Sequence, residues 1–159
     1  MARRATRGES GFSLAELLVL LAVIGIVTAF SVPMMLTYWR SSTLMAGARE
    51  VAAAINSARE LAIRENNNVC VTTDDGTRLQ YHLGTCGAAT WKGPVTDGGG
   101  NIRLDNGVTV NGTTNVIFNY LGAATQAGCY TVLRQNVTST LVVTVVQNGR
   151  VSIGVVPCV

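Results

Sequence analysis

One carboxylate, Glu16, stands at the start of a long apolar stretch. The twenty residues from Leu17 to Leu36 carry no charge. A carboxylate in hydrocarbon costs on the order of 2.5–3.5 kcal/mol at the centre of a membrane helix, so it persists there only with a partner or a function. Two kinds of chemistry fit Glu16: an ion pair with an amine, and interaction with the positive end of a helix dipole.

Other residue types that could support catalysis or metal binding do not form convincing patterns. The sequence has one histidine, His82, within an apparent strand, and no C-x-x-C motif. We expect His82 to be an ordinary surface residue. Asp74 and Asp75 precede Gly76 and are better explained by a turn than by paired catalytic carboxylates. The sequence therefore predicts neither an enzyme nor a metal site, and it indicates no cofactor.

The four cysteines favour structural disulfides. They allow three pairings, among which the sequence alone does not decide. We favour Cys70 with Cys86, across the first predicted hairpin region. We also favour Cys129 with Cys158, which would tie the C-terminal tail to the sheet. Disulfides require an oxidising compartment, so these pairings depend on a head that lies outside the cytoplasm.

The stretch from residue 17 to residue 36 predicts a membrane-spanning helix. About 20 apolar residues cross a bilayer core of roughly 30 Å. Apolar residues run all round this helix rather than along one stripe. A buried core helix is the alternative, but the rest of the chain is too small to surround it. Arg3, Arg4 and Arg7 precede the stretch, so the N-terminus is expected in the cytoplasm and the remainder outside it.

The hydrophobic periodicity changes beyond the apolar stretch. Apolar or small residues recur in steps of three and four, which predicts an amphipathic helix over residues 37–67. Asn66–Asn68 are expected to end it. If it continues from Phe12, the helix has about 54 residues and a length of about 80 Å. The face predicted to pack on the head comprises Leu44, Ala48, Val51, Ile55, Ala58, Leu61 and Ala62.

Residues 68–159 predict a β-sheet head. Asp75-Gly76 and Asn148-Gly149 each separate two β-rich runs, which indicates hairpins. The run NIRLDNGVTV predicts a further hairpin around Asn106-Gly107. Short strands are expected in VIFNYLG and CYTVLRQ, and residues 84–100 are expected to form a loop. The predicted fold class is α+β, with a long N-terminal helix, membrane-spanning in its first half, packed on an antiparallel sheet.

The N-terminus resembles the signal of the type IV prepilins. A short basic leader is followed by Gly11, Phe12, and then Glu16 at the fifth position after Gly11. The resemblance implies that residues 1–11 are removed by a prepilin peptidase, which also methylates the new amine of Phe12. Residues 12–36 would then form the membrane and assembly helix. In the family, the carboxylate pairs with the amine, which can belong to a neighbouring subunit.

Helix-breaking residues and two later motifs agree with this resemblance. Gly25 and Pro33 stand where type IV pilins carry residues that weaken or kink the helix. The helix end INSARELAIRENN and the runs IFNYLGAA and NGRVSI resemble the H-type pseudopilins of type II secretion and the FimT-like minor pilins. The resemblance implies a filament subunit of the bacterial inner membrane, anchored by a single span and partnered by other pilins or pseudopilins.

Three roles are compatible with the resemblance: a minor pseudopilin of a type II secretion filament, a minor type IV pilin for pilus biogenesis or DNA uptake, and a major pilin of the filament shaft. Some FimT-like proteins bind DNA through a Gly-Arg-x-Arg turn. Here Gly149-Arg150 is followed by Ser152 where the second arginine would stand. A single arginine provides one phosphate contact, whereas DNA affinity depends on several. The sequence therefore favours Arg150 as a solvated hairpin residue over a DNA contact.

We predict that the mature chain begins at Phe12. A glycine before the cut lets the peptidase approach the scissile backbone closely, and Gly11 supplies it. Intact-mass measurement and N-terminal sequencing of protein from the native host test this. A chain that retains Met1, or one that begins after Pro33, would contradict the assignment.

Overall fold

The computed structural model describes residues 12–156 and 158, so Gly11 and the predicted leader lie outside the described residues. One helix, α1 (Leu14–Arg64), has 51 residues and runs continuously through Gly25 and Pro33. It starts two residues after Phe12 and ends at Arg64, slightly inside the predicted range. The chain divides after Tyr38 into an N-terminal unit and a head, and each is described by itself.

The head contains two antiparallel sheets rather than the single sheet predicted. The first has five strands in the order β3-β2-β1-β5-β6, and the second has four in the order β4-β7-β8-β9. The strands are β1 (Val69–Asp74), β2 (Arg78–Leu83), β3 (Asn101–Arg103), β4 (Val108–Gly112), β5 (Val116–Phe118), β6 (Ala124–Gln126), β7 (Gly128–Arg134), β8 (Leu141–Val145) and β9 (Val151–Gly154). The hairpins expected at Asp75-Gly76 and Asn148-Gly149 are present as β1–β2 and β8–β9.

The predicted hairpin around Asn106-Gly107 is wrong. Its first strand, β3, pairs with β2 in the first sheet, and its second strand, β4, pairs with β7 in the second sheet. The Glu50 carboxylate of α1 accepts hydrogen bonds from the Asp105 backbone N–H at 3.1 Å and from Asn106 Nδ2 at 2.8 Å. These contacts hold the connecting turn against the helix, so the chain crosses from one sheet to the other.

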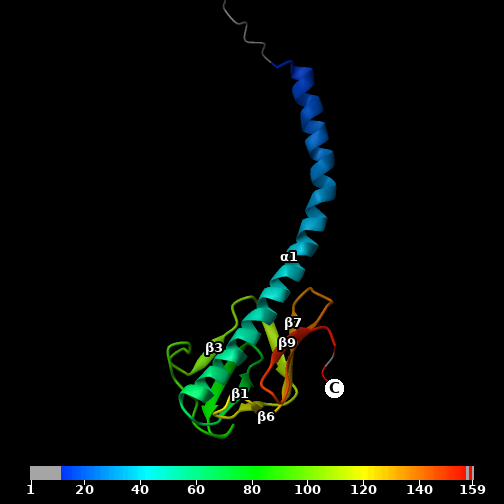
Figure 1. The fold of residues 1–159 in the computed structure, drawn as a ribbon. Coiled ribbons are helices and arrows are strands. Elements are labelled where there is room, and N and C mark those ends of the chain that lie inside the picture. Colours follow the sequence, from blue (N-terminus) through cyan, green and yellow to red (C-terminus); the bar gives the residue numbers. More distant parts are fainter. Residues whose placement is uncertain (1–11, 157, 159) are drawn as a thin grey trace, which may run out of the picture. The chain divides into compact units, whose positions relative to one another are not determined.

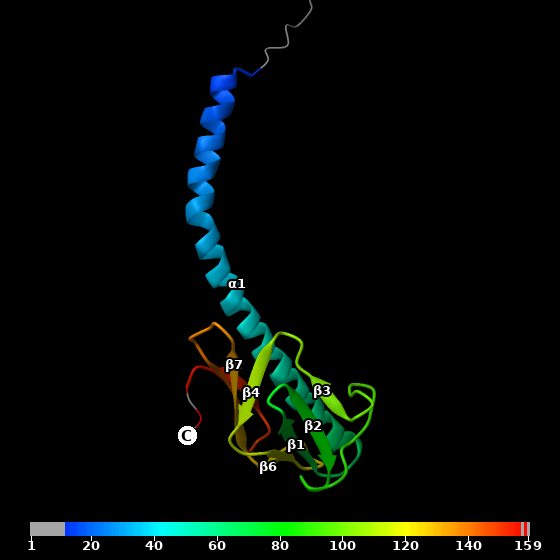
Figure 2. The same ribbon diagram turned by 180° about the vertical axis from the view of Figure 1, so that it is seen from behind.

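The head part of α1 packs on the sheets through the face predicted from its spacing (Figure 1). Seen from behind, the β1–β2 hairpin and β4 lie in front of the helix (Figure 2). Small side chains allow a close approach, because a Cβ added at Gly47 would stand 2.4 Å from Val108 Cγ1. Every buried hydrophobic residue of the described chain lies between Leu44 and Val145, so the core belongs wholly to the head.

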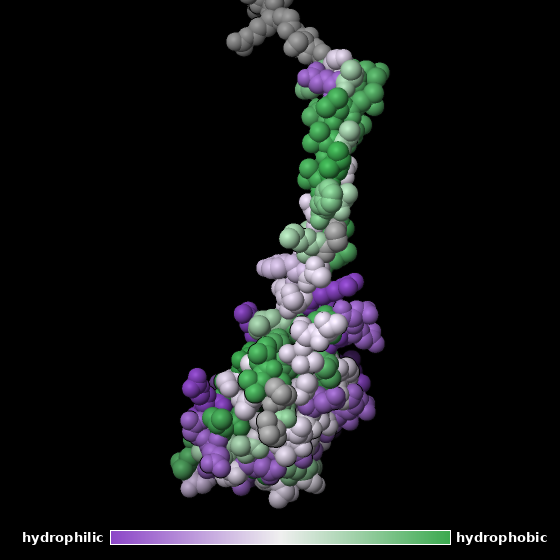
Figure 3. Space-filling model, turned by 90° about the vertical axis from the view of Figure 1, so that its right-hand side faces the viewer, coloured by the Kyte–Doolittle hydropathy of each residue, from purple (hydrophilic) through white to green (hydrophobic). Residues whose placement is uncertain are grey.

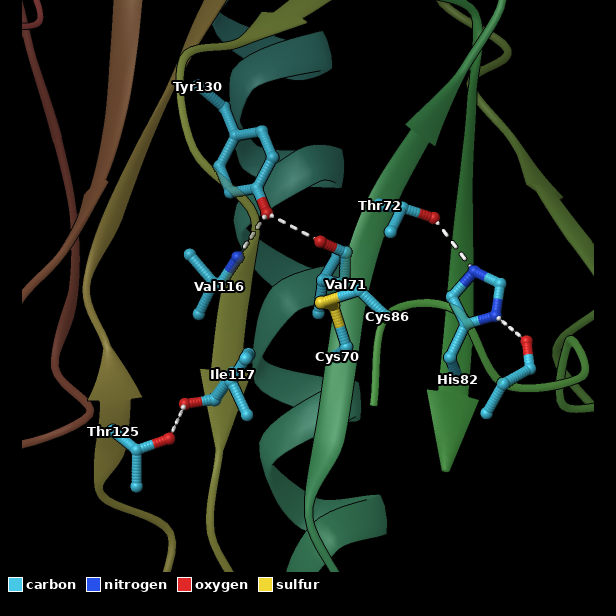
Figure 4. The surroundings of a disulfide bond; sticks show 10 residues. Cys70, Val71, Thr72, His82, Cys86, Val116, Ile117, Thr125 and Tyr130 are labelled. Atoms are coloured by element: carbon cyan, nitrogen blue, oxygen red, sulfur yellow. Dashed lines mark hydrogen bonds between the residues drawn. A yellow bond between two sulfur atoms is a disulfide. The ribbon is translucent and has the colours of Figure 1, made fainter. Parts of the chain in front are cut away.

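Two buried tyrosines connect the layers of the head. Tyr130 Oη donates a hydrogen bond to the Val71 carbonyl at 3.2 Å and accepts one from the Val116 N–H at 3.3 Å (Figure 4). Tyr81 Oη donates to the Ala54 carbonyl of α1. Burial raises the pKa of both hydroxyls above the usual range, and for Tyr81 the nearby Tyr130 adds to this effect. Both side chains therefore stay neutral and act as hydrogen-bonding groups.

His82 is buried, which corrects the expectation of a surface residue. Its ring nitrogens lie 3.0 Å from Thr72 Oγ1 and 2.7 Å from the Ala88 carbonyl (Figure 4). Ala88 belongs to the predicted loop 84–100, which the Cys70–Cys86 disulfide ties to β1. The loop covers His82 because it is fastened over β2.

The second disulfide joins Cys129 of β7 to Cys158 of the C-terminal tail. Both disulfides are the pairings that the sequence favoured. Thr131 Oγ1 lies 3.4 Å from Cys158 Sγ, so the tail returns across the sheet to β7. Leu141, Val142 and Val143 of the intervening strand β8 are all buried. Because consecutive side chains point to opposite faces of a strand, both faces of β8 must be covered. The tail lies over one of them.

Three segments of the head converge on two glycines. Arg59 of α1 donates from Nε to the Gly122 carbonyl at 2.7 Å. Gly149, at φ +78°, lies so close that a Cβ added there would stand 2.1 Å from the Gly122 carbonyl oxygen. Arg59, Gly122 and Gly149 thus meet at one point, which we call the glycine junction. Each of them lies in a run that resembles known pilins.

We predict that Gly149→Ala destabilises the head by about 2–4 kcal/mol, because alanine is strained at this positive φ and its Cβ meets backbone that does not yield easily. Urea unfolding of the fragment 39–159, which contains the whole core, measures the effect. Gly98→Ala is the matched control, since a Cβ there meets nothing within 4 Å. Equal stability of the two variants would contradict the glycine junction.

We predict that removing the second disulfide with the double change Cys129→Ser and Cys158→Ser lowers stability by up to about 3–4 kcal/mol, the chain-entropy value for a loop of this length. Faster amide exchange should appear first in β9 and the tail, because termini fray unless they are tied down. Peptide mapping without reduction tests the native pairing. Free Cys129 and Cys158 in protein made in the periplasm would rule it out.

Candidate functional site

The N-terminal unit presents an apolar surface on all sides of the helix. Its large hydrophobic side chains from Phe12 to Leu36 are all exposed in the isolated chain. Figure 3 shows this part of α1 as an almost continuous hydrophobic surface. By length and composition, the helix is suited to cross a membrane. A surface of this kind requires cover by lipid or by other helices.

The start of the helix positions Glu16. Ser13 precedes Leu14, the first helical residue, and its carbonyl accepts hydrogen bonds from the N–H groups of Glu16 at 3.0 Å and Leu17 at 3.1 Å. Ser13 and Glu16 therefore occupy the two positions of an S-x-x-E capping box, which the sequence analysis did not identify. A carboxylate in this first turn interacts favourably with the positive end of the helix dipole.

The proposed partner of Glu16 is not supplied by the described part of this chain. Glu16 forms no ion pair with any residue that the structure describes. Phe12, whose amine would be the partner after processing, is 71 % exposed. The predicted cut between Gly11 and Phe12 involves Gly11, which lies outside the described residues. Pairing between Glu16 and the amine therefore stays a prediction.

The few polar residues of the apolar segment are compatible with close helix packing. Thr28 Oγ1 donates to the Ile24 carbonyl at 2.9 Å, and Ser31 Oγ donates to the Val27 carbonyl at 2.8 Å. The hydroxyls are satisfied within the helix and need no water. A Cβ added at Gly25 would meet nothing within 4 Å, so this position is open to a neighbouring helix. Pro33 lies in the same helix, which continues past it.

The head carries two further surface features that the sequence analysis missed. The turn between β5 and β6 exposes Tyr120 and Leu121 beside the glycine junction. A cavity of about 150 Å³ is bordered by Trp91 and by the last turns of α1. The sequence pattern that could have indicated the exposed turn is the pair of large apolar residues, Tyr120 and Leu121, directly before Gly122. No local sequence pattern indicates the cavity, because it forms where the end of α1 meets the loop that follows β2.

Arg150 is exposed and directly follows Gly149 of the glycine junction. Its side chain has no hydrogen-bond or ion-pair partner among the described residues. Arg59, the nearest cation on α1 at this junction, is engaged by the Gly122 carbonyl. At the glycine junction, the described residues therefore provide one unpaired cation, Arg150, rather than a basic patch. In the described part of the chain, no cluster of three histidine, cysteine or acidic residues is placed to hold a metal ion.

Comparison with known proteins agrees with this architecture. A curated fimbrial protein of Pseudomonas aeruginosa is 26% identical over 133 residues, which cover 82% of each chain. The fold is similar to the minor pseudopilin EpsH of the Vibrio cholerae type 2 secretion system. That match has a TM-score of 0.53 and 15% identity, and it covers 70% of this chain and 95% of that one.

A second solved structure, the type IV minor pilin FimU of Pseudomonas aeruginosa, has a TM-score of 0.53 and 18% identity, covering 76% of this chain and 92% of that one. These two likenesses confirm the predicted fold class. Residues 47–149 match the family described as type II transport protein GspH. This match covers most of the head: the buried face of α1 from Gly47 onward, the first sheet, strands β4, β7 and β8 of the second sheet, and the glycine junction. The chain therefore belongs to the GspH family of pilin-like subunits.

Proposed function

We propose that this chain is a minor pseudopilin of a type II secretion filament, which a prepilin peptidase processes and which assembles through residues 12–36. The observation that carries the proposal is the uncharged surface of residues 17–36 of α1, preceded by the carboxylate of Glu16 in the first turn of the helix. A helix of this kind is held in the bilayer before assembly and packs against other helices afterwards. Its partners in the filament are other pilins or pseudopilins.

The proposal assigns Glu16 to assembly rather than to membrane insertion. Processing would create an amine at Phe12 with a reference pKa of about 7.7–8.0, largely charged at neutral pH. In an apolar environment the attraction between this amine and a carboxylate is much stronger than in water. Pairing between neighbouring subunits would therefore set the axial register of the helices. Gly25 and Pro33 would let the segment adapt to its neighbours.

The proposed location follows from the same segment. The helix would cross the bacterial inner membrane once, with the N-terminus in the cytoplasm and the head outside it. An oxidising compartment for the head agrees with the two disulfides of the structure. Several exposed apolar side chains of the head, such as Leu121, would then be available to other subunits.

A minor type IV pilin is the second candidate. It is favoured by the fimbrial relatives and by the likeness to the minor pilin FimU. DNA binding receives less support, because Arg150 is a single exposed cation beside the glycine junction. A major shaft pilin is less favoured, since both solved structures described above are of minor subunits.

We predict that Glu16→Ala abolishes assembly while processing and membrane insertion continue. Alanine makes the segment more apolar, so insertion is not impaired, but the partner of the amine is lost. Each variant is expressed in a host strain that lacks this gene. Secretion, pilus formation and the amount of the chain in sheared filaments are then measured. Glu65→Ala, at the exposed end of α1, is the matched control.

Filament incorporation of Glu16→Ala at the wild-type level would refute the pairing. Restoration of pilus formation without any effect on secretion would favour the minor pilin over the pseudopilin.

A further inference from the structure

Trp39 and Arg40 follow the uncharged stretch of α1, and the head does not cover them. Trp39 is 57% exposed, and Arg40 is exposed as well. The first buried hydrophobic residue of the described chain is Leu44, so the head core begins about one helical turn beyond Arg40. Arg40 forms no ion pair with any residue that the structure describes. An indole and a guanidinium thus stand next to each other between the apolar stretch and the core.

These two side chains suit the headgroup layer of a membrane. An indole ring combines a large apolar surface with one N–H donor, and tryptophan is enriched at membrane–water interfaces for this reason. A guanidinium donates hydrogen bonds in a planar geometry that matches the oxygens of a phosphate. The carbonyls of Trp39 and Arg40 accept hydrogen bonds from Thr43 Oγ1 at 2.7 Å and 3.0 Å. A partner at this point is therefore bound through the two side chains.

The spacing of the charges along α1 matches the thickness of a bilayer. Arg40 is the next charged residue after Glu16, because residues 17–39 carry no charge. At a rise of about 1.5 Å per residue, a regular helix covers about 36 Å from Glu16 to Arg40. This length exceeds a hydrocarbon core of roughly 30 Å and is less than the roughly 40–45 Å that includes both headgroup layers. A helix that crosses the membrane therefore places one of these charges in each headgroup layer.

We infer that Trp39 and Arg40 form a phospholipid-binding site at the outer surface of the membrane, with the indole in the headgroup layer and the guanidinium on a lipid phosphate. The ligand class is an anionic phospholipid, because its negative charge attracts a cation near the membrane surface. This contact sets the depth of the helix before assembly and keeps Glu16 at the opposite surface. The inference rests on the proposed function, in which α1 crosses the membrane, and deepens it by naming the lipid partner.

The experiment measures the depth of Trp39 in the full chain, reconstituted into vesicles of phosphatidylethanolamine and phosphatidylglycerol. The variant Trp91→Phe leaves Trp39 as the only tryptophan. Lipids that carry bromine on their acyl chains quench tryptophan fluorescence at the depth of the bromine. Bromine near the headgroups should quench Trp39 at least about twofold more than bromine near the chain ends, because the indole lies at the interface. Equal quenching at both depths, stronger quenching by the deeper bromine, or none at all overturns this position.

Trp91 is the matched control. Its ring centre lies 6.0 Å from Cζ of Arg64, which follows Trp39 by roughly 37 Å along α1. In the variant Trp39→Phe, the remaining Trp91 should therefore not be quenched by bromine at either depth. The unchanged chain, which has both tryptophans, should show intermediate quenching, so the result does not depend on the fold of the Trp91→Phe variant.

A second probe reports the middle of the apolar stretch. Phe30→Trp, in a chain whose two native tryptophans are replaced by phenylalanine, places an indole about 15 Å before Arg40 along a regular helix. This probe should be quenched more strongly by bromine near the chain ends than by bromine near the headgroups.

Lipid selectivity tests the role of Arg40. From the quenching of Trp39, brominated phosphatidylglycerol should have an affinity about two to five times that of brominated phosphatidylcholine, as expected for one arginine near an anionic headgroup. Arg40→Gln removes this charge and should bring the ratio to about one. Arg49→Gln is the matched control, because Arg49 is exposed on the same helix about 14 Å farther along, beyond the screening length of physiological salt. A preference that survives Arg40→Gln overturns the phosphate contact.

The Phe30→Trp probe separates this inference from the proposed function. Deep quenching of this probe without quenching of Trp39 overturns the lipid contact and retains the membrane-spanning helix. Shallow quenching of Trp39 without quenching of the probe overturns the proposed span and retains the lipid contact. Absence of quenching at both positions overturns both.

Discussion

The close approach of α1 to the two sheets is the constraint on which the head depends. Gly47 and the alanines of the buried face bring the helix backbone near the strands, and no larger residue fits at Gly47 without displacing Val108. Packing at this distance lets short polar links from the helix reach the connecting turns. Glu50 holds the turn that crosses between the sheets, and Arg59 holds the turn that precedes β6.

These two links explain how a head made of short strands presents fixed surface features. Several strands have only three residues, which gives them little pairing energy of their own. The helix and the disulfides compensate by anchoring the segments between the strands. The Cys70–Cys86 disulfide fastens the loop that borders the cavity at Trp91, and the glycine junction fastens the turn that carries Leu121.

The sequence predicted the features whose cause is local. Steps of three and four along α1 identified its buried face, and Asn148-Gly149 identified the last hairpin. The errors arose where a distant residue decides the outcome. An Asn-Gly pair suits a hairpin and a crossing between sheets alike, and the crossing is selected by Glu50, 55 residues away from Asp105. His82 is buried by a loop whose position depends on a disulfide. The cavity bordered by Trp91 and the position of the β5–β6 turn likewise arise only when separated segments meet.

Under the proposed function, the carboxylate of Glu16 would serve a segment with two environments, the bilayer before assembly and the filament afterwards. Before assembly, Glu16 has the positive end of its own helix as a partner, which contributes about 0.3–1 kcal/mol at an exposed site and more when partly buried. This contribution is smaller than the cost of placing a carboxylate in hydrocarbon. Glu16 is therefore tolerated near the membrane surface but remains incompletely compensated. Under the proposed function, an amine from a neighbouring subunit would supply the missing part, and the deficit left by the helix dipole would then be a driving force for assembly.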